Sequence, residues 1–230
     1  MVVGMSVVTT NSPAAGSPAG ASGAAGSRER ILSVAAERFL AAGYVETSLR
    51  DLAGDAGMKA GSLYYHFDSK DQLLIAVLER GMEIMVDAFD RAAELTAESS
   101  DVESLAAHIE AHLQALHDNR PYTAGHVTLF RTAPSVVREA IVPLRDDYES
   151  MWTDLLARLV PNRPANEITM LRLTLFGAMN ASIDWLDTER SSVGPLARLV
   201  TEQFWFGVAS GHNGRLTKGN IMGKTTEFQT

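Results

Sequence analysis

Apolar residues recur every three or four positions along most of the chain, which is the spacing of one face of an α-helix. Ile31, Ala35 and Phe39 begin this pattern, and Gly43 ends its first segment. The strict alternation of apolar and polar residues that marks strands is absent. We therefore predict an all-α fold of about nine helices, at roughly 28–42, 49–56, 60–67, 70–97, 102–118, 122–132, 134–160, 165–188 and 195–210. Pro143 lies inside one of these and should kink or break it.

Both ends of the chain lack the helical pattern. Residues 11–27 are almost wholly Ala, Gly, Ser and Pro, so they cannot bury enough apolar surface to offset the entropy of ordering. We expect residues 1–27 to form a disordered tail and the polar residues 212–230 to form a second loose tail. The first tail lacks the cationic start and continuous apolar run of a signal peptide, and no segment has the apolar length of a membrane span. These features favour a cytoplasmic protein.

Two short helices follow the first long one. Thr47 or Ser48 can cap a helix whose apolar stripe ends at Gly57, and a third helix begins near Ala60. A tight turn containing glycine between two short helices is typical of a helix-turn-helix.

The third helix lies within the stretch "MKAGSLYYHFDSKD", residues 58–71. Leu63 and Phe67 are four positions apart, so they can face the first two helices. The exposed side then carries hydroxyl, imidazole and ammonium groups of the kind that position a protein on DNA phosphates. Gly61 has no side chain, which lets a phosphate or a base edge approach the backbone closely. Taken singly, an aromatic residue here could equally pack against a neighbouring helix, but the coincidence of so many donors favours a DNA contact surface.

Residues 28–78 resemble the DNA-binding domain of the tetracycline-repressor (TetR) family. The resemblance is carried by Phe39, "GY" at 43–44, "TSL" at 47–49, "LA" at 52–53, "AG" at 56–57 and "GSLYYHF" at 61–67, followed by "SK" at 69–70. It implies a three-helix DNA-binding domain over 28–72, a larger helical regulatory domain over 73–211, and a homodimer that represses transcription until a small ligand releases it. The DNA contacts that it implies are Thr47, Ser48, Arg50, Lys59, Ala60, Gly61, Ser62, Tyr64, Tyr65, His66 and Lys70.

The sequence departs from the family pattern at one position of the expected DNA-contact surface, and its charge is unevenly distributed. Many relatives have Ser-Lys before the glycine, where this sequence has Lys59-Ala60, so the base preference of relatives cannot be copied. The chain carries a net charge of −8. Residues 28–70 hold six Lys or Arg and six Asp or Glu, and are neutral. The remainder holds the whole negative charge, so the helix-turn-helix end should face DNA, with an affinity that falls as salt rises.

Residues of about 80–190 should surround a cavity between helices. Aromatic side chains with polar tips occur there among Met and Leu, a mixture that suits a mostly apolar effector with one or two polar anchors. The region also resembles regulatory domains linked to lipid, steroid or acyl-CoA breakdown. Each candidate could instead be a core residue; they are Phe89, His112, Leu116, Tyr122, His126, Phe130, Trp152, Phe176 and Met179.

The last two long helices are the expected dimer interface. Gly177, Ala178, Ala181 and Ser182 would let a partner helix approach closely, and Trp205 would add apolar area. The alternative is that these helices complete the core of a monomer. We favour the dimer because one helix-turn-helix gains little specificity without a second half-site.

Other classes of function are weakly supported. The chain has no cysteine, which excludes a disulfide framework, a cysteine zinc site and a cysteine nucleophile. No cofactor is implied, and no set of nucleophile, base and orienting residue stands out. His108 and His112 lie one helical turn apart and could share a metal or serve a helical-pocket enzyme. An adaptor that keeps the helix-turn-helix only for packing, and a transcriptional activator, also stay open.

Overall fold

The computed structural model describes residues 19–209, and within this range every regular element is helical. The elements in chain order are α1 (Ala19–Glu46), α2 (Leu49–Asp55), α3 (Ala60–His66), α4 (Lys70–Leu95), α5 (Asp101–Asp118), α6 (Arg120–Thr123), α7 (Gly125–Thr128), the 3₁₀ turn η1 (Phe130–Thr132), α8 (Ser135–Leu159), α9 (Ala165–Asn180), α10 (Ser182–Trp185) and α11 (Gly194–Ala209). The all-α prediction is confirmed. The segment expected at 122–132 is divided into the short elements α6, α7 and η1, and the segment expected at 165–188 is divided into the long helix α9 and the single turn α10. The predicted order of helices is kept.

Two expectations about helix limits differ from the structure. Helix α1 begins at Ala19, so residues 19–27, which were expected in the tail, are helical. Residues 1–18 and the tail expected at 212–230 lie outside the described residues. Helix α8 runs through Pro143, so of the kink or break expected there the break does not occur. Pro143 is exposed, while Ile141 and Tyr148 are buried on either side of it, so packing holds the helix together across the missing hydrogen bond.

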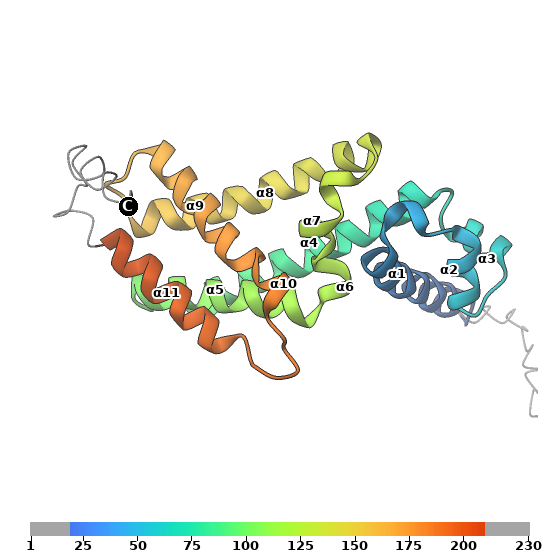
Figure 1. The fold of residues 1–230 in the computed structure, drawn as a ribbon, viewed down its shortest axis with the longest axis horizontal. Helices are drawn as coiled ribbons and strands as arrows, with labels where there is room; N and C mark the ends of the chain where they lie inside the picture. Colours follow the sequence, from blue (N-terminus) through green and yellow to red (C-terminus); the bar gives the residue numbers. More distant parts are fainter. Residues whose placement is uncertain (1–18, 210–230) are drawn as a thin grey trace, which may run out of the picture.

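Helix α4 runs from the three N-terminal helices into the larger bundle (Figure 1). The described helices enclose two large hydrophobic cores and a small third cluster of Leu116, Ala124 and Ile183. The first core joins α1, α2 and α3 to the first half of α4, and it also receives Val137 and Ile141 from α8. The second core joins the rest of α4 to α5, α8, α9 and α11, with the fully buried Trp152 among its members. Helix α4 is therefore shared, with Leu73 and Leu78 in the first core and Met85 and Phe89 in the second.

Local sequence signals explain where the short helices start and stop. Gly43 and Gly57 have φ values of 82° and 68°, a left-handed conformation that glycine adopts without steric penalty. The Ser48 hydroxyl accepts a hydrogen bond from the Asp51 N–H at 3.1 Å, and Ser69 caps α4 in the same way through Gln72. The turn at Gly57 and the Ser69 cap thus lie on the two sides of α3.

Gly81 lies on α4 where the two cores meet. A Cβ atom built there would stand 2.6 Å from the Tyr122 carbonyl oxygen and 3.1 Å from Nε2 of His126. Real Cβ atoms do not approach a backbone oxygen so closely, so only glycine lets the segment that holds α6 and α7 lie directly against α4.

We predict that Gly81→Ala destabilises the protein by about 1–3 kcal/mol, the usual range for overpacking. Alanine would otherwise favour a helix interior by about 0.5–1 kcal/mol, so the steric effect must exceed this gain. Urea unfolding measures the change. Gly54→Ala is the matched control, because no atom lies within 4 Å of its added Cβ and it should gain stability. Equal stabilisation by both substitutions would contradict the close contact at Gly81.

Candidate nucleic-acid interface and ligand pocket

Helix α3 presents one buried and one exposed face. Leu63 and Phe67 are 0% and 4% exposed and belong to the first core, as the spacing predicts. Tyr64 and Tyr65 are 54% and 82% exposed. Lys59, Ala60, Gly61 and Ser62 are also exposed, whereas His66 is half-buried with its ring set edge-on to that of Tyr65, 5.3 Å between centroids. The exposed face thus gathers donors and aromatic rings around the open backbone at Gly61.

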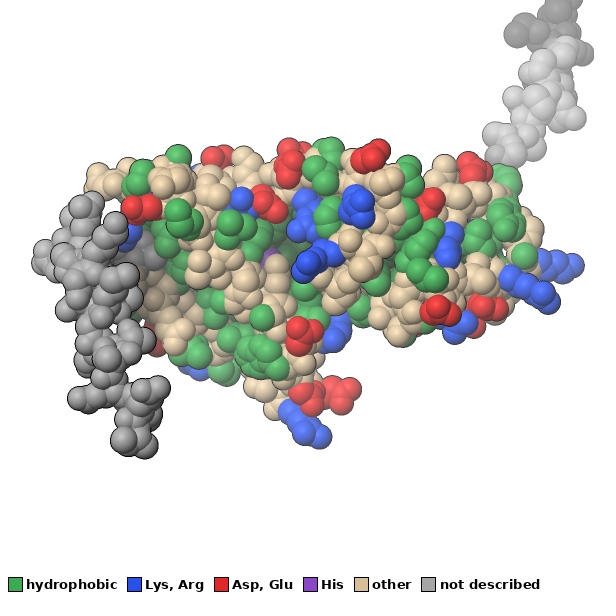
Figure 2. Space-filling view, turned by 45° about the horizontal axis from the view of Figure 1, so that its top comes forward, with side chains coloured by type: hydrophobic (Ala, Val, Ile, Leu, Met, Phe, Trp, Pro, Cys, Tyr) green, Lys and Arg blue, Asp and Glu red, His purple; other side chains and the backbone are tan. Residues whose placement is uncertain are grey.

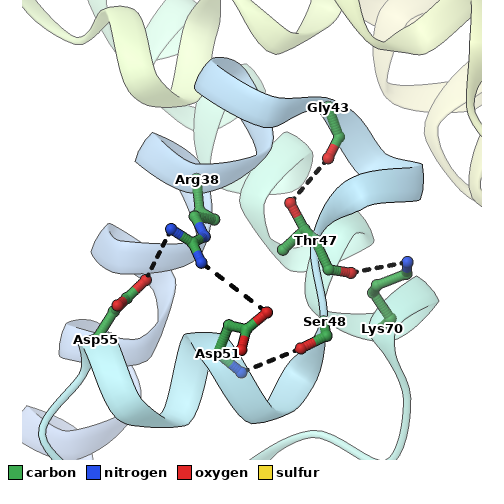
Figure 3. A network of polar contacts seen from close by, with 7 residues as sticks. All are labelled: Arg38, Gly43, Thr47, Ser48, Asp51, Asp55 and Lys70. Atoms are coloured by element: carbon green, nitrogen blue, oxygen red, sulfur yellow. Dashed lines mark hydrogen bonds and ion pairs between the residues drawn. The ribbon is translucent and has the colours of Figure 1, made fainter.

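The start of α2 adds a second set of candidate contacts. Ser48 and Arg50 are exposed, and Ser48 also caps the helix (Figure 3). Thr47 differs from the expectation: it is 2% exposed, and its hydroxyl donates to the Gly43 carbonyl at 2.8 Å. That hydroxyl closes the end of α1 and is not on the surface.

Lys70 has a structural task that the sequence did not reveal. Its Nζ donates to the carbonyls of Tyr44 and Thr47 at 2.8 and 2.9 Å, and to that of Val45 at 3.4 Å. The ammonium also lies 4.2 Å from the centroid of the Tyr44 ring. Its charge therefore holds the end of α1 and the α1–α2 loop against the start of α4 (Figure 3).

Tyr44 completes this attachment, which no pattern of apolar residues in the sequence indicated. Its hydroxyl donates to the carboxylate of Asp71. Burial, and next the hydrogen bond to Asp71, raise the pKa of Tyr44 to about 12, so the phenol stays a donor at neutral pH. The signal available in the sequence was the pair Lys70-Asp71 directly after the Ser69 cap.

The acidic charges of α2 are partly balanced by α1. Arg38 lies 3.5 Å from the carboxylate of Asp55 and 3.9 Å from that of Asp51 (Figure 3). Both pairs are exposed, so each contributes little stability. Their consequence is electrostatic: the carboxylates of α2 repel a phosphate less strongly next to Arg50.

A pocket lies in the larger bundle, between α4, α5, the α6–α7 segment, α8 and α9. It is partly open to solvent and has a volume of about 60 Å³, and its lining residues are Met82, Met85, His112, Leu116, Thr123, His126, Val127, Arg145, Tyr148, Glu149, Phe176 and Asn180. Figure 2 shows a hollow near the middle of one face, with a histidine visible inside it and Lys or Arg side chains gathered beside it. Four of the nine predicted ligand residues line the pocket, namely His112, Leu116, His126 and Phe176.

The other five predicted ligand residues do not line this pocket. Phe89, Trp152 and Met179 are buried in the second core, where the Phe89 and Trp152 rings pack edge to face, 5.5 Å between centroids. Tyr122 and Phe130 pack against the first core. Periodicity marks all of these positions as apolar, but it does not distinguish a pocket wall from a core.

His112 forms a polar network inside the pocket. Its Nδ1 accepts from the Tyr148 hydroxyl at 2.9 Å, and its Nε2–H donates to Oδ1 of Asn180 at 3.2 Å. Burial lowers the pKa of His112 to about 4, and burial raises the pKa of Tyr148 well above its usual range. Both groups are neutral at pH 7, so they can orient a polar group of a ligand without adding charge.

His108 and His112 do not share a partner. Nδ1 of His108 donates to the Ser104 carbonyl at 2.7 Å, and the His108 ring packs on Phe89, 4.4 Å between centroids. Both ring nitrogens of His112 are already used. Among the residues that the structure describes, no three His, Cys, Asp or Glu side chains are grouped so that they could hold a metal ion.

An apolar surface covers one side of α9, α10 and α11. Gly177, Ala178 and Ala181 are exposed there, as are several large apolar side chains, namely Met170, Leu173, Trp185, Leu199 and Phe206. Trp205 is half-buried against the second core. Ser182 is wrongly included in the expected dimer contacts, because it is fully buried and shares a hydrogen bond of 2.8 Å with Nε2 of His117.

Two family models match the chain over this architecture. Residues 31–77 match the model of bacterial regulatory proteins of the tetR family, and residues 98–195 match the C-terminal domain model described as tetracyclin repressor-like. Together they span more than half of the chain and cover its helix-turn-helix and the pocket residues other than Met82 and Met85. The chain belongs to the TetR family of transcriptional regulators.

Curated relatives include both a transcriptional activator and a transcriptional repressor. The chain is 28% identical to the transcriptional activator FasR of Mycolicibacterium smegmatis over 185 residues, which cover 78% of this chain and 81% of the relative. It is 38% identical to the transcriptional repressor KstR2 of Rhodococcus jostii over 80 residues, covering 35% of this chain and 38% of the relative.

Solved structures share the fold. The TetR-family regulator PfmR from Thermus thermophilus is 26% identical, with a TM-score of 0.67 over 77% of this chain and 94% of that chain. FadR from Bacillus subtilis, solved in complex with stearoyl-CoA, is 20% identical, with a TM-score of 0.62 over 76% of this chain and 96% of that chain. Among residues 19–209, no helix has both the length and the apolar character needed to span a membrane.

We predict that Lys70→Met lowers the free energy of unfolding by about 1–3 kcal/mol, because partly buried carbonyls lose a charged donor. Thermal and urea unfolding measure this loss. Lys59→Met is the control: its side chain is exposed at the start of α3, so the change should stay within about 0.5 kcal/mol. Equal stabilities of the two variants would contradict a structural role of Lys70.

We also predict that acid destabilises the protein through His112. The native pKa of about 4 lies below the ordinary value of 6.5, so the unfolded chain binds the proton first as pH falls. The contribution of neutral His112 to the free energy of unfolding is complete above pH 6.5. It is lost as pH falls towards 4, with a slope of at most about 1.4 kcal/mol per pH unit. His112→Gln removes one group that binds a proton on unfolding. It should therefore reduce the slope of the unfolding free energy against pH by up to about 1.4 kcal/mol per pH unit. An unchanged slope would show that His112 does not titrate in this way.

Proposed function

We propose that this regulator binds a palindromic operator as a homodimer, represses transcription, and is released by a small, mostly apolar effector. The observation that carries the proposal is the two-faced helix α3, whose Leu63 and Phe67 are buried while Tyr64, Tyr65 and Lys59 stay exposed. A helix whose buried face is packed on the core in this way can insert its exposed face into the major groove. The protein would act in the cytoplasm, by binding and not by catalysis.

The proposed DNA contacts are the exposed members of the predicted set. Ser48, Arg50 and the start of α2 would hold the phosphate backbone, since a capped helix start with a nearby cation suits an anion. Residues 59–62, together with Tyr64, Tyr65 and His66, would face the groove. Lys70 and Thr47 would contribute indirectly, by fixing the loop that carries Ser48.

The proposed dimer uses the apolar surface of α9, α10 and α11. Exposed Gly177, Ala178 and Ala181 would allow a second copy of α9 to pack closely, with Leu173 and Phe206 around them. Pairing of this face with its own copy gives a symmetric interface, and the two α3 helices would then read two half-sites.

The proposed effector carries an acyl chain. Met82, Met85, Leu116, Val127 and Phe176 supply an apolar lining, whereas the polar groups of the pocket are few and already oriented. The stearoyl-CoA of FadR shows one ligand class that this fold accommodates. A cavity of about 60 Å³ is smaller than the roughly 300 Å³ of an ordinary small-molecule site, so binding must widen the pocket.

The test is a selection of genomic fragments with purified full-length protein, followed by gel shifts of the best fragment across a salt series. We expect a palindromic site bound by two chains, with affinity falling steeply as salt rises because phosphate contacts release counterions. The double variant Lys59→Ala/Tyr65→Ala should bind at least about tenfold more weakly, with little change in stability.

Arg158→Ala is the control for the loss of one positive charge, since Arg158 is exposed near the end of α8 in the larger bundle. It should bind the operator as the wild type does. Failure to enrich any fragment at low salt, with the protein folded and dimeric, would overturn the proposal. A reporter gene placed behind the selected fragment then distinguishes repression from activation.

A further inference from the structure

Arg145 is a charged residue of the ligand pocket whose charge is not balanced by any described carboxylate. Its Nη1 donates to the His126 carbonyl at 3.1 Å, and its guanidinium carbon lies 4.3 Å from the centroid of the Phe130 ring. No ion pair joins it to an acidic residue within 19–209. Glu149, the acidic residue among those lining the pocket, is instead paired with Arg172.

Arg145 is therefore the arginine that lines the pocket, and Glu149, the carboxylate that lines it, is already paired with Arg172. Three further titratable lining residues are neutral at pH 7, because burial lowers the pKa of His112 and of His126 to about 4 and raises the pKa of Tyr148 well above its usual range. A guanidinium binds a carboxylate or a phosphate through two parallel hydrogen bonds, so an apolar pocket with one such group fits an anionic amphiphile.

Arg145 also belongs to a chain of contacts that ends on α4. It holds the carbonyl of His126, and Nε2–H of His126 donates to the Leu78 carbonyl at 2.7 Å. Leu78 is fully buried in the first core, and Phe130, beneath the guanidinium, packs against that core. The contacts of Arg145 thus connect α8 through α7 to the part of α4 that packs with the helix-turn-helix.

We propose that Arg145 selects an effector with an anionic group, and that the bound anion competes with the His126 carbonyl for the guanidinium. Loss of the Arg145–His126 bond frees α7 from α8 and alters its hold on α4. This inference rests on the effector pocket proposed above and names the group that the pocket recognises. The anion is either the carboxylate of a fatty acid or the phosphates of its coenzyme A thioester.

Two matched pairs of ligands separate these sources: decanoate with 1-decanol, and decanoyl-CoA with S-decanoyl-pantetheine. Isothermal titration calorimetry on the full-length protein measures each affinity. Wild type should bind the anionic member of one pair about tenfold or more tightly than its neutral match, as charge-assisted hydrogen bonds do. The pair that shows the preference identifies the anion.

The variants assign the preference to one residue. Arg145→Gln should bind both members of that pair equally, and Arg145→Lys should keep part of the preference because it keeps charge but not the planar fork. Arg138→Gln is the matched control: this arginine is also on α8 and donates to a backbone carbonyl, that of Ala133, at 2.9 Å, but it does not line the pocket. It should behave as wild type.

A second readout tests the link to α4. Fluorescence anisotropy of a labelled operator fragment should show release by the saturating anionic ligand in wild type, and a smaller release in Arg145→Gln at saturation.

Three outcomes would overturn the inference. An anion preference that survives in Arg145→Gln would place the selectivity elsewhere. Tighter binding of the neutral member of both pairs by wild type would show that the pocket does not select charge. If none of the four ligands binds wild type, the acyl effector class fails, and this inference fails with it. The first two outcomes leave the proposed effector class standing, so the two failures are distinguishable.

Discussion

Helix α4 must satisfy two hydrophobic cores at once, and the rest of the structure depends on this constraint. Leu73, Leu74 and Leu78 pack with the helix-turn-helix, whereas Met85 and Phe89 pack with the larger bundle. The helix is continuous over Lys70–Leu95, so its two halves move together. A shift imposed at Met82 or Met85 in the pocket therefore reaches the start of α4, where the helix-turn-helix is attached.

The attachment at that end is polar and short-ranged. Lys70 holds the last carbonyls of α1 and the loop before α2, and Asp71 accepts from Tyr44. Apolar contacts of Leu63 and Phe67 pack α3 against the first core, but such contacts are non-directional. Hydrogen bonds from a fixed ammonium have direction, so they set the angle at which the loop carrying Ser48 leaves α1. The orientation of the exposed DNA face thus depends on the first turn of α4.

Sequence patterns were sufficient for the fold and for the exposed face of α3, because both follow from local periodicity. They were insufficient where the same residue type can either contact DNA or stabilise the fold. A lysine and a threonine beside a helix start suit a phosphate, yet Lys70 and Thr47 bind backbone carbonyls. The Ala-rich stretch after residue 18 fits a tail by its Gly and Ser and a helix by its Ala, and the structure has the helix. The role of Arg145 in the pocket could not be predicted, because its contact with His126 joins two helices that only the fold brings together.

The small size of the pocket bears on regulation. A ligand changes an equilibrium between two conformations only through a difference in its affinity for them, and equal affinities shift nothing. An effector that fitted the cavity of about 60 Å³ without moving its walls would bind this conformation readily and leave α4 in place. An acyl chain that fills this pocket, as proposed, would displace Met82, Met85 or the α6–α7 segment. Because Gly81 lets that segment touch α4 directly, with no side chain between them to absorb the movement, widening of the pocket has to act on the helix that carries the DNA-binding end.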